Sequence, residues 1–170
     1  MPVQRLNHAV LFVRDVDRSA AFYRDVLGFR VKVERPGRAV FLQAEGSTND
    51  HDLGLFAAGA AAGPSGAGRS TVGLYHLAWE VDTLAELARI RGALAEAGAL
   101  AGASDHVTTK ALYGKDPDGL EFEISWLLPA DLITPEIEAQ GATTRPLDLA
   151  AEIERYGPNT EGGVGVSVRA

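Results

Sequence analysis

The sequence predicts an α+β fold in which two βαβββ modules follow in tandem and form a cup-shaped mixed sheet, with a C-terminal extension beyond them. Two observations predict this fold. A short apolar strand, an amphipathic helix and three further strand-like segments occur in that order twice. A stretch of almost pure Ala, Gly, Ser and Pro separates them. We expect one domain at 1–128, with module 1 at 4–57, a flexible connector at 58–71, module 2 at 72–128 and the extension at 129–170.

The first module opens with the strand-like segment LNHAVLFV, which is rich in β-branched and aromatic residues. The spacing of Phe22 and Val26 predicts a helix that ends at Gly28, with Asp17 as its N-cap. Three short strands are expected next, around RVKVER, RAVFLQA and HDLGLFA, because turn-forming PG and GSTND segments separate them.

The second module opens with the strand-like segment LYHLAWEV. The following helix, TLAELARIRGALAEAG, begins with a capping box formed by Thr83 and Glu86. Its Leu87, Ile90 and Leu94 predict one buried stripe. Three strand candidates complete the module: 101–104, 108–113 and 120–127.

The C-terminal extension has a weaker pattern. We expect one short helix near 147–156 and a Gly-rich end that frays. The extension is expected to pack across the domain or against a subunit partner, and the sequence does not choose between the two.

Composition excludes several classes of partner and chemistry. With 170 residues, 46% of them hydrophobic, the chain can bury a sizeable core. A net charge of -7 without a Lys and Arg cluster argues against nucleic acid or anionic membrane and favours a small-molecule ligand. The absence of cysteine excludes disulfides, thiolate nucleophiles and Cys-ligated metal centres. Without a signal peptide or long apolar run, the protein is expected to be cytoplasmic.

Two histidines and one glutamate form the candidate metal site. His8 and His76 each stand third in the apolar strand that opens a module. Superposing the repeats on these histidines makes Leu55 the counterpart of Glu123, which lies in the last strand of module 2. Edge-to-edge pairing of the modules would bring His8, His76 and Glu123 together at the floor of a cup. Two imidazoles and one carboxylate leave one side of a divalent metal open, which is typical of non-haem Fe(II) oxygenases.

The residues alone leave other interpretations open. His8 and His76 are equally explained as hydrogen-bonded core histidines, the commoner role of a histidine in an apolar strand. Glu121 and Glu123 share one face of their strand because side chains alternate, and both are explained as its solvent face.

Three quoted segments, LNHAVLFVRDVDRSAAFYRDVLGFRV, LYHLAWEV and YGKDPDGLEFEI, resemble the vicinal oxygen chelate (glyoxalase/bleomycin resistance/dioxygenase) superfamily. The resemblance covers residues 6 to about 128 and is strongest to one-domain extradiol catechol 2,3-dioxygenases. It implies the vicinal oxygen chelate fold, and it implies that His8, His76 and Glu123 are the metal ligands. Glu121 would then lie toward the rim as a solvated carboxylate.

Three further residues resemble pocket residues of these dioxygenases. His51, in HDLGLF, resembles their acid–base histidine, and Tyr113 resembles a tyrosine that hydrogen-bonds the substrate. His106 resembles their remaining pocket histidine, although its spacing departs slightly. From the residues alone, His51 is equally a turn residue, His106 an exposed loop residue and Tyr113 an ordinary sheet aromatic. The long connector departs from the dioxygenase pattern.

The resemblance implies an Fe(II)-dependent extradiol dioxygenase that opens a catechol-type aromatic diol beside its hydroxyls with O2, with Mn, Ni or Zn as alternative metals. His51 would take a proton from the diol and later return it, while Tyr113 and His106 hold its oxygens. A homodimer or higher homo-oligomer is expected. Two alternatives stay open, a glyoxalase-like metal-dependent isomerase or transferase and a non-catalytic aromatic drug-binding protein. A glyoxalase-like site would need a fourth protein ligand near Leu55, and the sequence has none there.

Overall fold

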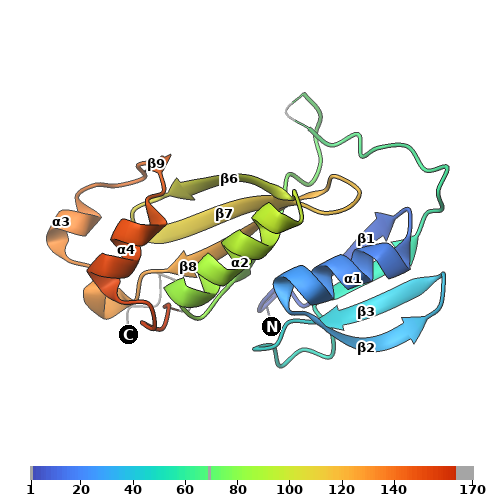
Figure 1. Cartoon of the computed structure of the whole chain (residues 1–170), viewed down its shortest axis with the longest axis horizontal. Helices are drawn as coiled ribbons and strands as arrows, with labels where there is room; N and C mark the ends of the chain where they lie inside the picture. The colour runs from blue at the N-terminus through green and yellow to red at the C-terminus, as the bar shows by residue number, and fades with distance from the viewer. Residues whose placement is uncertain (1, 69, 164–170) are drawn as a thin grey trace. The chain divides into compact units, whose positions relative to one another are not determined.

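The fold contains two βαβββ units, as the sequence predicts. The computed structural model describes residues 2–68 and 70–163 (Figure 1). Unit 1 runs up to Gly66 and includes Asp116–Leu120; unit 2 covers Ala67–Lys115 and continues from Glu121. The turn Asp116–Leu120 joins two strands of unit 2 and packs within unit 1. The α+β class with two mixed sheets is therefore confirmed.

Unit 1 places one helix against a four-stranded sheet (Figure 1). Its elements are β1 (Ala9–Val13), α1 (Val16–Leu27), β2 (Arg30–Arg35), β3 (Ala39–Gln43) and β4 (Leu53–Ala57). The sheet order is β1-β4-β3-β2, with β1 and β4 parallel and the other pairs antiparallel. Leu11 and Val13 of β1 are buried, whereas Val10 and Phe12, which alternate with them along the strand, are exposed. The core of unit 1 thus lies on the helix side of the sheet.

The N-cap of the first helix lies two residues earlier than expected. Asp15 is the N-cap, because it has extended backbone angles and its carboxylate accepts N–H groups of the first turn, including that of Asp17. The expectation that Asp17 is the cap was wrong, since Asp17 lies inside the helix. The helix ends as predicted at Gly28, whose φ of 78° is left-handed.

Unit 2 repeats the arrangement with a five-stranded sheet. Its first elements are β5 (Leu77–Glu80), α2 (Leu84–Glu96), β6 (Leu100–Asp105), β7 (Thr109–Lys115) and β8 (Glu121–Leu127). The sheet order is β5-β8-β7-β6-β9. The Thr83 hydroxyl accepts the N–H of Glu86, which confirms half of the capping box, whereas the Glu86 carboxylate binds Arg89. The predicted stripe of Leu87, Ile90 and Leu94 is buried.

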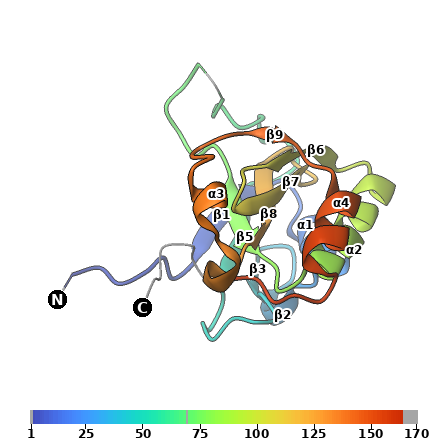
Figure 2. The ribbon, with the colours of Figure 1, turned by 90° about the vertical axis from the view of Figure 1, so that its left-hand side faces the viewer.

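The C-terminal extension packs on unit 2. It contains a 3-10 turn (Ala130–Leu132), α3 (Pro135–Glu138), β9 (Arg145–Pro146) and α4 (Leu149–Tyr156). Helix α4 matches the predicted helix, and Figures 1 and 2 show it beside α2 on one face of the second sheet. The pairing of β9 with β6 was not predicted. Most of the expected Gly-rich end lies outside the described residues.

The connector between β4 and β5 has little regular structure among its described residues. One isolated bridge joins Gly68 to Thr71. The guanidinium of Arg14 donates to the carbonyl of Ala62, which ties part of the connector to the end of β1. Across residues 2–68 and 70–163, no helix combines the length and hydropathy that crossing a membrane requires.

Candidate active site

The histidines at the start of the two modules keep equivalent places. His8 directly precedes β1 and His76 directly precedes β5, because both strands begin three residues later than the segments that the sequence predicts. Ala9 pairs with Leu53 of β4, and Leu77 pairs with Phe122 of β8. The exposed His8 belongs to unit 1, whereas the half-buried His76 belongs to unit 2.

The sheet registers correct the predicted counterpart of Glu123. Glu123 lies opposite Ala78, and the equivalent position in unit 1 is Gly54, opposite Val10. The counterpart is therefore not Leu55, because one additional residue separates the paired strands in unit 2. Leu55 is completely buried. Gly54 has no side chain to offer a metal, so the open face of β4 still lacks a fourth ligand.

His76 and Glu123 approach each other in unit 2. His76 Nε2 lies 3.2 Å from Glu123 Oε2, because the parallel β5–β8 register brings the start of β5 beside Glu123. The other carboxylate oxygen of Glu123 accepts a 2.6 Å hydrogen bond from the Ser125 hydroxyl. Nδ1 of His76 is buried, and no described residue hydrogen-bonds it. The Glu123 carboxylate is thus held through one oxygen by Ser125, and its other oxygen lies beside Nε2 of His76.

The geometry and chemistry of this pair suit a metal. Two atoms each about 2.1 Å from a metal are about 3.0 Å apart at a right angle, close to the 3.2 Å observed between Nε2 and Oε2. Imidazole and carboxylate suit divalent iron, manganese or zinc. Among the described residues, no group of three or more His, Asp or Glu side chains is arranged to hold a metal. The structure thus unites two of the three predicted ligands, and the third, His8, belongs to unit 1.

The second carboxylate of β8 lies at the strand end. Glu121 is the first residue of β8 and pairs with Lys115, the last residue of β7. Glu123 lies further along, opposite Tyr113. This placement agrees with the assignment of Glu123, rather than Glu121, as the candidate ligand.

Tyr113 of β7 and His106, which follows β6, form a second pair. The Tyr113 hydroxyl lies 2.8 Å from His106 Nε2, and its ring centroid lies 6.1 Å from that of His76. His106 Nδ1 lies 2.9 Å from the Thr144 hydroxyl. Burial, followed by the charge of Glu123, raises the pKa of Tyr113 above its ordinary value. Tyr113 therefore keeps its proton at neutral pH and has one to donate.

His51 and His8 lie together in unit 1. Their ring centroids are 4.6 Å apart, and the ring of Phe41 lies 5.0 Å from His51. Nδ1 of His51 lies 3.0 Å from an Asp50 carboxylate oxygen. Nδ1 of His8 lies 2.7 Å from Asn7 Oδ1. Unit 1 therefore unites a predicted ligand with the predicted acid–base residue.

The loop before β4 is organised by Asp52, the neighbour of His51. The buried Asp52 carboxylate accepts hydrogen bonds from the Ala44 N–H, the Ser47 hydroxyl and the Asn49 amide. These bonds hold the loop together and fix the backbone next to His51. His51 is therefore the half-buried end of an ordered loop, rather than a freely exposed turn residue.

Three residues near the site were not predicted. Ser125 follows Glu123 on the same strand face, so strand alternation was an available signal for it. Tyr75, whose ring centroid lies 4.7 Å from that of His76, directly precedes it in sequence. Thr144 had no signal, because its contact with His106 depends on the unpredicted β9.

Comparisons with known proteins give one family. The family model described as Glyoxalase/Bleomycin resistance protein/Dioxygenase superfamily matches residues 5–124. The chain is 30% identical over 172 residues to Biphenyl-2,3-diol 1,2-dioxygenase 3 of Rhodococcus globerulus, covering 92% of this chain and 86% of that protein. It is 30% identical over 160 residues to Catechol-2,3-dioxygenase of Bacillus subtilis (strain 168), covering 89% of this chain and 52% of that protein.

Other relatives are longer or show the fold alone. The Manganese-dependent 2,3-dihydroxybiphenyl 1,2-dioxygenase of Geobacillus genomosp. 3 is 27% identical over 128 residues, covering 72% of this chain and 36% of that protein. The chain thus spans about half the length of the Bacillus relative and about a third of the Geobacillus relative. A solved glyoxylase/bleomycin resistance protein/dioxygenase domain from Frankia sp. EAN1pec has a TM-score of 0.62 at 23% identity, covering 73% of this chain and 92% of that chain. The family match ends within β8, so the whole C-terminal extension lies beyond it.

Proposed function

Because the chain belongs to the glyoxalase/bleomycin resistance protein/dioxygenase superfamily, we propose that it is a metal-dependent extradiol dioxygenase acting on catechol-type aromatic diols with O2. The observation that carries the proposal is the 3.2 Å approach of His76 Nε2 to Glu123 Oε2, with Tyr113 opposite Glu123. The names of three relatives, each a catechol or biphenyl-diol dioxygenase, support this substrate class.

The metal would be held by His76 and Glu123, with His8 as the third ligand. The first two are assigned on their geometry, and His8 is assigned on the family resemblance. Fe(II) is the proposed metal, with manganese as the alternative because one relative is named for it. When bound, the metal supplies Lewis acidity and a path for electrons between the diol and O2. Ser125 would orient the Glu123 carboxylate through its 2.6 Å hydrogen bond.

His51 is proposed to move the proton. Its Nδ1 is engaged by Asp50, so Nε2 is the atom that would take a proton from a diol hydroxyl and return it as the ring opens. Contact with the ring of Phe41 holds the imidazole at a half-buried position. Histidine is the side chain that most often performs general acid–base catalysis.

Tyr113 is proposed to hold the substrate by a hydrogen bond. Its raised pKa keeps the hydroxyl protonated at neutral pH, so it can donate to an oxygen of the diol. His106 contacts that hydroxyl at 2.8 Å and would fix its direction. A donor aimed in advance at developing negative charge is the usual means by which such a residue lowers a barrier.

Oxygen uptake tests the proposal. Purified full chain is loaded anaerobically with Fe(II) or Mn(II), and O2 consumption is followed on adding catechol or 2,3-dihydroxybiphenyl. We expect uptake together with the yellow product of ring opening beside a hydroxyl. Uptake should be lost in Glu123→Ala and kept in the matched control Glu121→Ala.

Other outcomes would overturn the proposal in different ways. Bound metal without oxygen uptake on any diol of a substituted panel would favour an isomerase or transferase of the superfamily. Failure to bind any divalent metal would favour a protein that sequesters an aromatic molecule. Loss of uptake in Glu121→Ala but not in Glu123→Ala would reverse the assignment of the carboxylate.

A further inference from the structure

The C-terminal extension reaches the edge of the sheet beside His106. Strand β9 pairs antiparallel with the end of β6, with Arg145 opposite Asp105. One residue earlier in the extension, the Thr144 hydroxyl lies 2.9 Å from His106 Nδ1. Two consecutive residues of the extension, which lies outside the segment that the family model matches, therefore contact the last residue of β6 and the residue that follows it.

Asp105 and His106, the residue that follows β6, have partners on different faces of the sheet. Asp105 contacts Lys110, which also contacts Glu152 of α4. His106 faces Tyr113, which pairs across β7 and β8 with Glu123. The extension thus binds the helix-covered face through Arg145 and the face that carries the candidate site through Thr144.

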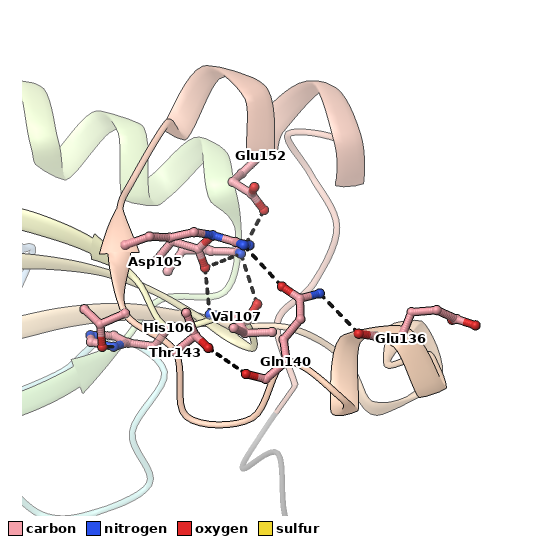
Figure 3. Close-up of polar contacts among 10 residues, drawn as sticks. Asp105, His106, Val107, Glu136, Gln140, Thr143 and Glu152 are labelled. Carbon is pink, nitrogen blue, oxygen red and sulfur yellow. Dashed lines mark hydrogen bonds and ion pairs between the residues drawn. The ribbon is translucent and has the colours of Figure 1, made fainter.

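A buried ion cluster anchors the extension. Lys110 is fully buried, with Nζ 2.6 Å from Asp105 Oδ1 and 2.9 Å from Glu152 Oε2. Arg145 Nε lies 2.7 Å from the other oxygen of Asp105. Figure 3 shows Glu152 of α4 and Asp105 of β6 meeting in this cluster. The cluster holds both β9, through Arg145, and α4, through Glu152. Thr144 directly precedes β9 and is therefore held in place with it.

The same cluster fixes the backbone that follows His106. Val107 has a φ of 72°, a left-handed angle that a β-branched residue adopts only when its surroundings impose it. Its N–H donates to Asp105 Oδ1 at 2.8 Å, and its carbonyl accepts from Lys110 Nζ at 3.0 Å. The N–H and the carbonyl of Val107 are therefore both held by the buried Asp105–Lys110 ion pair, which fixes the backbone next to His106.

We infer that Thr144 is a positioning residue whose hydroxyl donates to Nδ1 of His106 and holds the imidazole as the Nε2–H tautomer, so that Nε2–H donates to the Tyr113 oxygen. Among the hydrogen bonds of the described residues, His106 Nδ1 is the only partner of the Thr144 hydroxyl. Donation in this direction leaves the Tyr113 proton free for another acceptor. Each donated hydrogen bond polarises the next, which strengthens the donor at the end of the chain.

The inference rests on the proposed function in one respect, since the acceptor of the Tyr113 proton is taken to be the bound diol. The part that concerns Thr144 and His106 can be measured without metal or substrate. Two-bond proton–nitrogen NMR spectra distinguish the tautomers of a histidine, and a His106→Gln variant identifies the His106 signal among the four histidines of the chain.

The test uses two adjacent threonines. Thr144→Val removes the hydroxyl that contacts His106, whereas the matched control Thr143→Val removes one that donates to the carbonyl of Gln140 within the extension. We expect a single Nε2–H tautomer in the unmodified chain and in Thr143→Val, and a mixture of tautomers in Thr144→Val. Thr144→Ser should restore the single tautomer.

Activity provides an independent readout. With the metal-loaded enzyme, Thr144→Val should lower kcat about tenfold and leave KM within about twofold, as expected for a residue acting through an outer contact. An unchanged His106 tautomer in Thr144→Val, or an equal change in Thr143→Val, would overturn the inference even in an active enzyme. Absence of diol turnover together with the expected tautomer change would instead overturn the proposed function and leave the positioning role standing.

Discussion

The two units have the same βαβββ order but hold their candidate site residues in different ways. In unit 1, the Nδ1 atoms of His8 and His51 contact their sequence neighbours, Asn7 and Asp50. In unit 2, His76 contacts Glu123 across two strands. A contact between sequence neighbours orients a ring weakly, because both partners move together, whereas a contact across strands is fixed by the sheet register.

Under the proposed function, the two units would contribute different kinds of group. In unit 2, His76 and Glu123 lie at a separation that suits two ligands of one metal. The Tyr113 hydroxyl is held by its contact with His106. In unit 1, the His51 imidazole lies beside the ring of Phe41. The exposed His8 hydrogen-bonds, among the described residues, only its neighbour Asn7. Groups that hold a metal benefit from rigidity, while a group that moves a proton must change partners during the reaction.

The largest expected effect comes from breaking the unit 2 pair. Glu123→Ala removes a charged ligand, so metal content, measured by elemental analysis after anaerobic loading, should fall close to zero. Turnover should fall by more than the roughly 10- to 100-fold that loss of an outer contact costs. Ser125→Ala is the matched control, because it removes only the hydrogen bond to Glu123 and should weaken metal affinity about tenfold. Full metal binding by Glu123→Ala would contradict the pair as a metal site.

The next effect separates the role of unit 1 from that of unit 2. His51→Gln should keep its metal and lose about 100- to 10,000-fold in turnover, the usual contribution of a general acid–base residue. Steady-state oxygen uptake and metal analysis on the same sample measure both quantities. Asp50→Asn keeps an oxygen that can accept from His51 Nδ1 and removes an exposed charge, so its turnover should change less than about threefold. A His51→Gln variant that loses its metal would make His51 a ligand.

Sequence reasoning predicted those parts of the molecule that depend on local patterns. Both modules, the end of the first helix at Gly28 and the cap at Thr83 follow from periodicity and turn chemistry. The pairing of β9 with β6 does not, since a two-residue strand has no periodicity of its own. The counterpart of Glu123 was displaced by one residue because equal numbering of two repeats assumes that no residue is inserted between paired strands.

The sequence could indicate candidate site residues where they lie on a single strand. Alternation places Glu121 and Glu123 on one face, but only the register with β7 shows that Glu123 lies opposite Tyr113 and Glu121 at the strand end. The buried Lys110 gave no signal, because a lysine in a strand is ordinarily exposed and its partners lie in β6 and α4. Contacts between distant segments were therefore the part that the sequence could not supply.

A third prediction concerns the ion cluster that supports unit 2. Lys110→Met removes the cation that pairs with both Asp105 and Glu152 and leaves two buried carboxylates without it. The free energy of unfolding, measured in urea, should fall by about 3 kcal/mol. Arg89→Met, which breaks the exposed pair with Glu86, should change it by less than about 1 kcal/mol. Equal effects of the two variants would show that the cluster does not anchor the extension.

The smallest effect contrasts two buried aspartates, one in each unit. Burial alone would raise the pKa of Asp105, but hydrogen bonds from Lys110 and Arg145 outweigh burial and lower it. Its contribution to stability is therefore complete above the ordinary aspartate pKa of about 3.9 and is lost as the pH falls below that value. In unit 1, burial raises the pKa of Asp116, and the charge of Asp118 adds to the rise. The contribution of Asp116 is complete below about pH 3.9 and is lost as the pH rises through its folded pKa.

The two aspartates should therefore give pH profiles of opposite sign. Urea unfolding is measured between about pH 3 and pH 7 for the unmodified chain and for the variants Asp105→Asn and Asp116→Asn. The stability difference between the unmodified chain and Asp105→Asn should shrink toward acid, and the difference from Asp116→Asn should grow. Profiles of the same sign would mean that the Lys110 and Arg145 contacts do not offset burial at Asp105, because burial would then dominate at both sites. Opposite signs would show that unit 2 tolerates a buried charge by pairing it, while unit 1 favours the neutral form of its buried carboxyl.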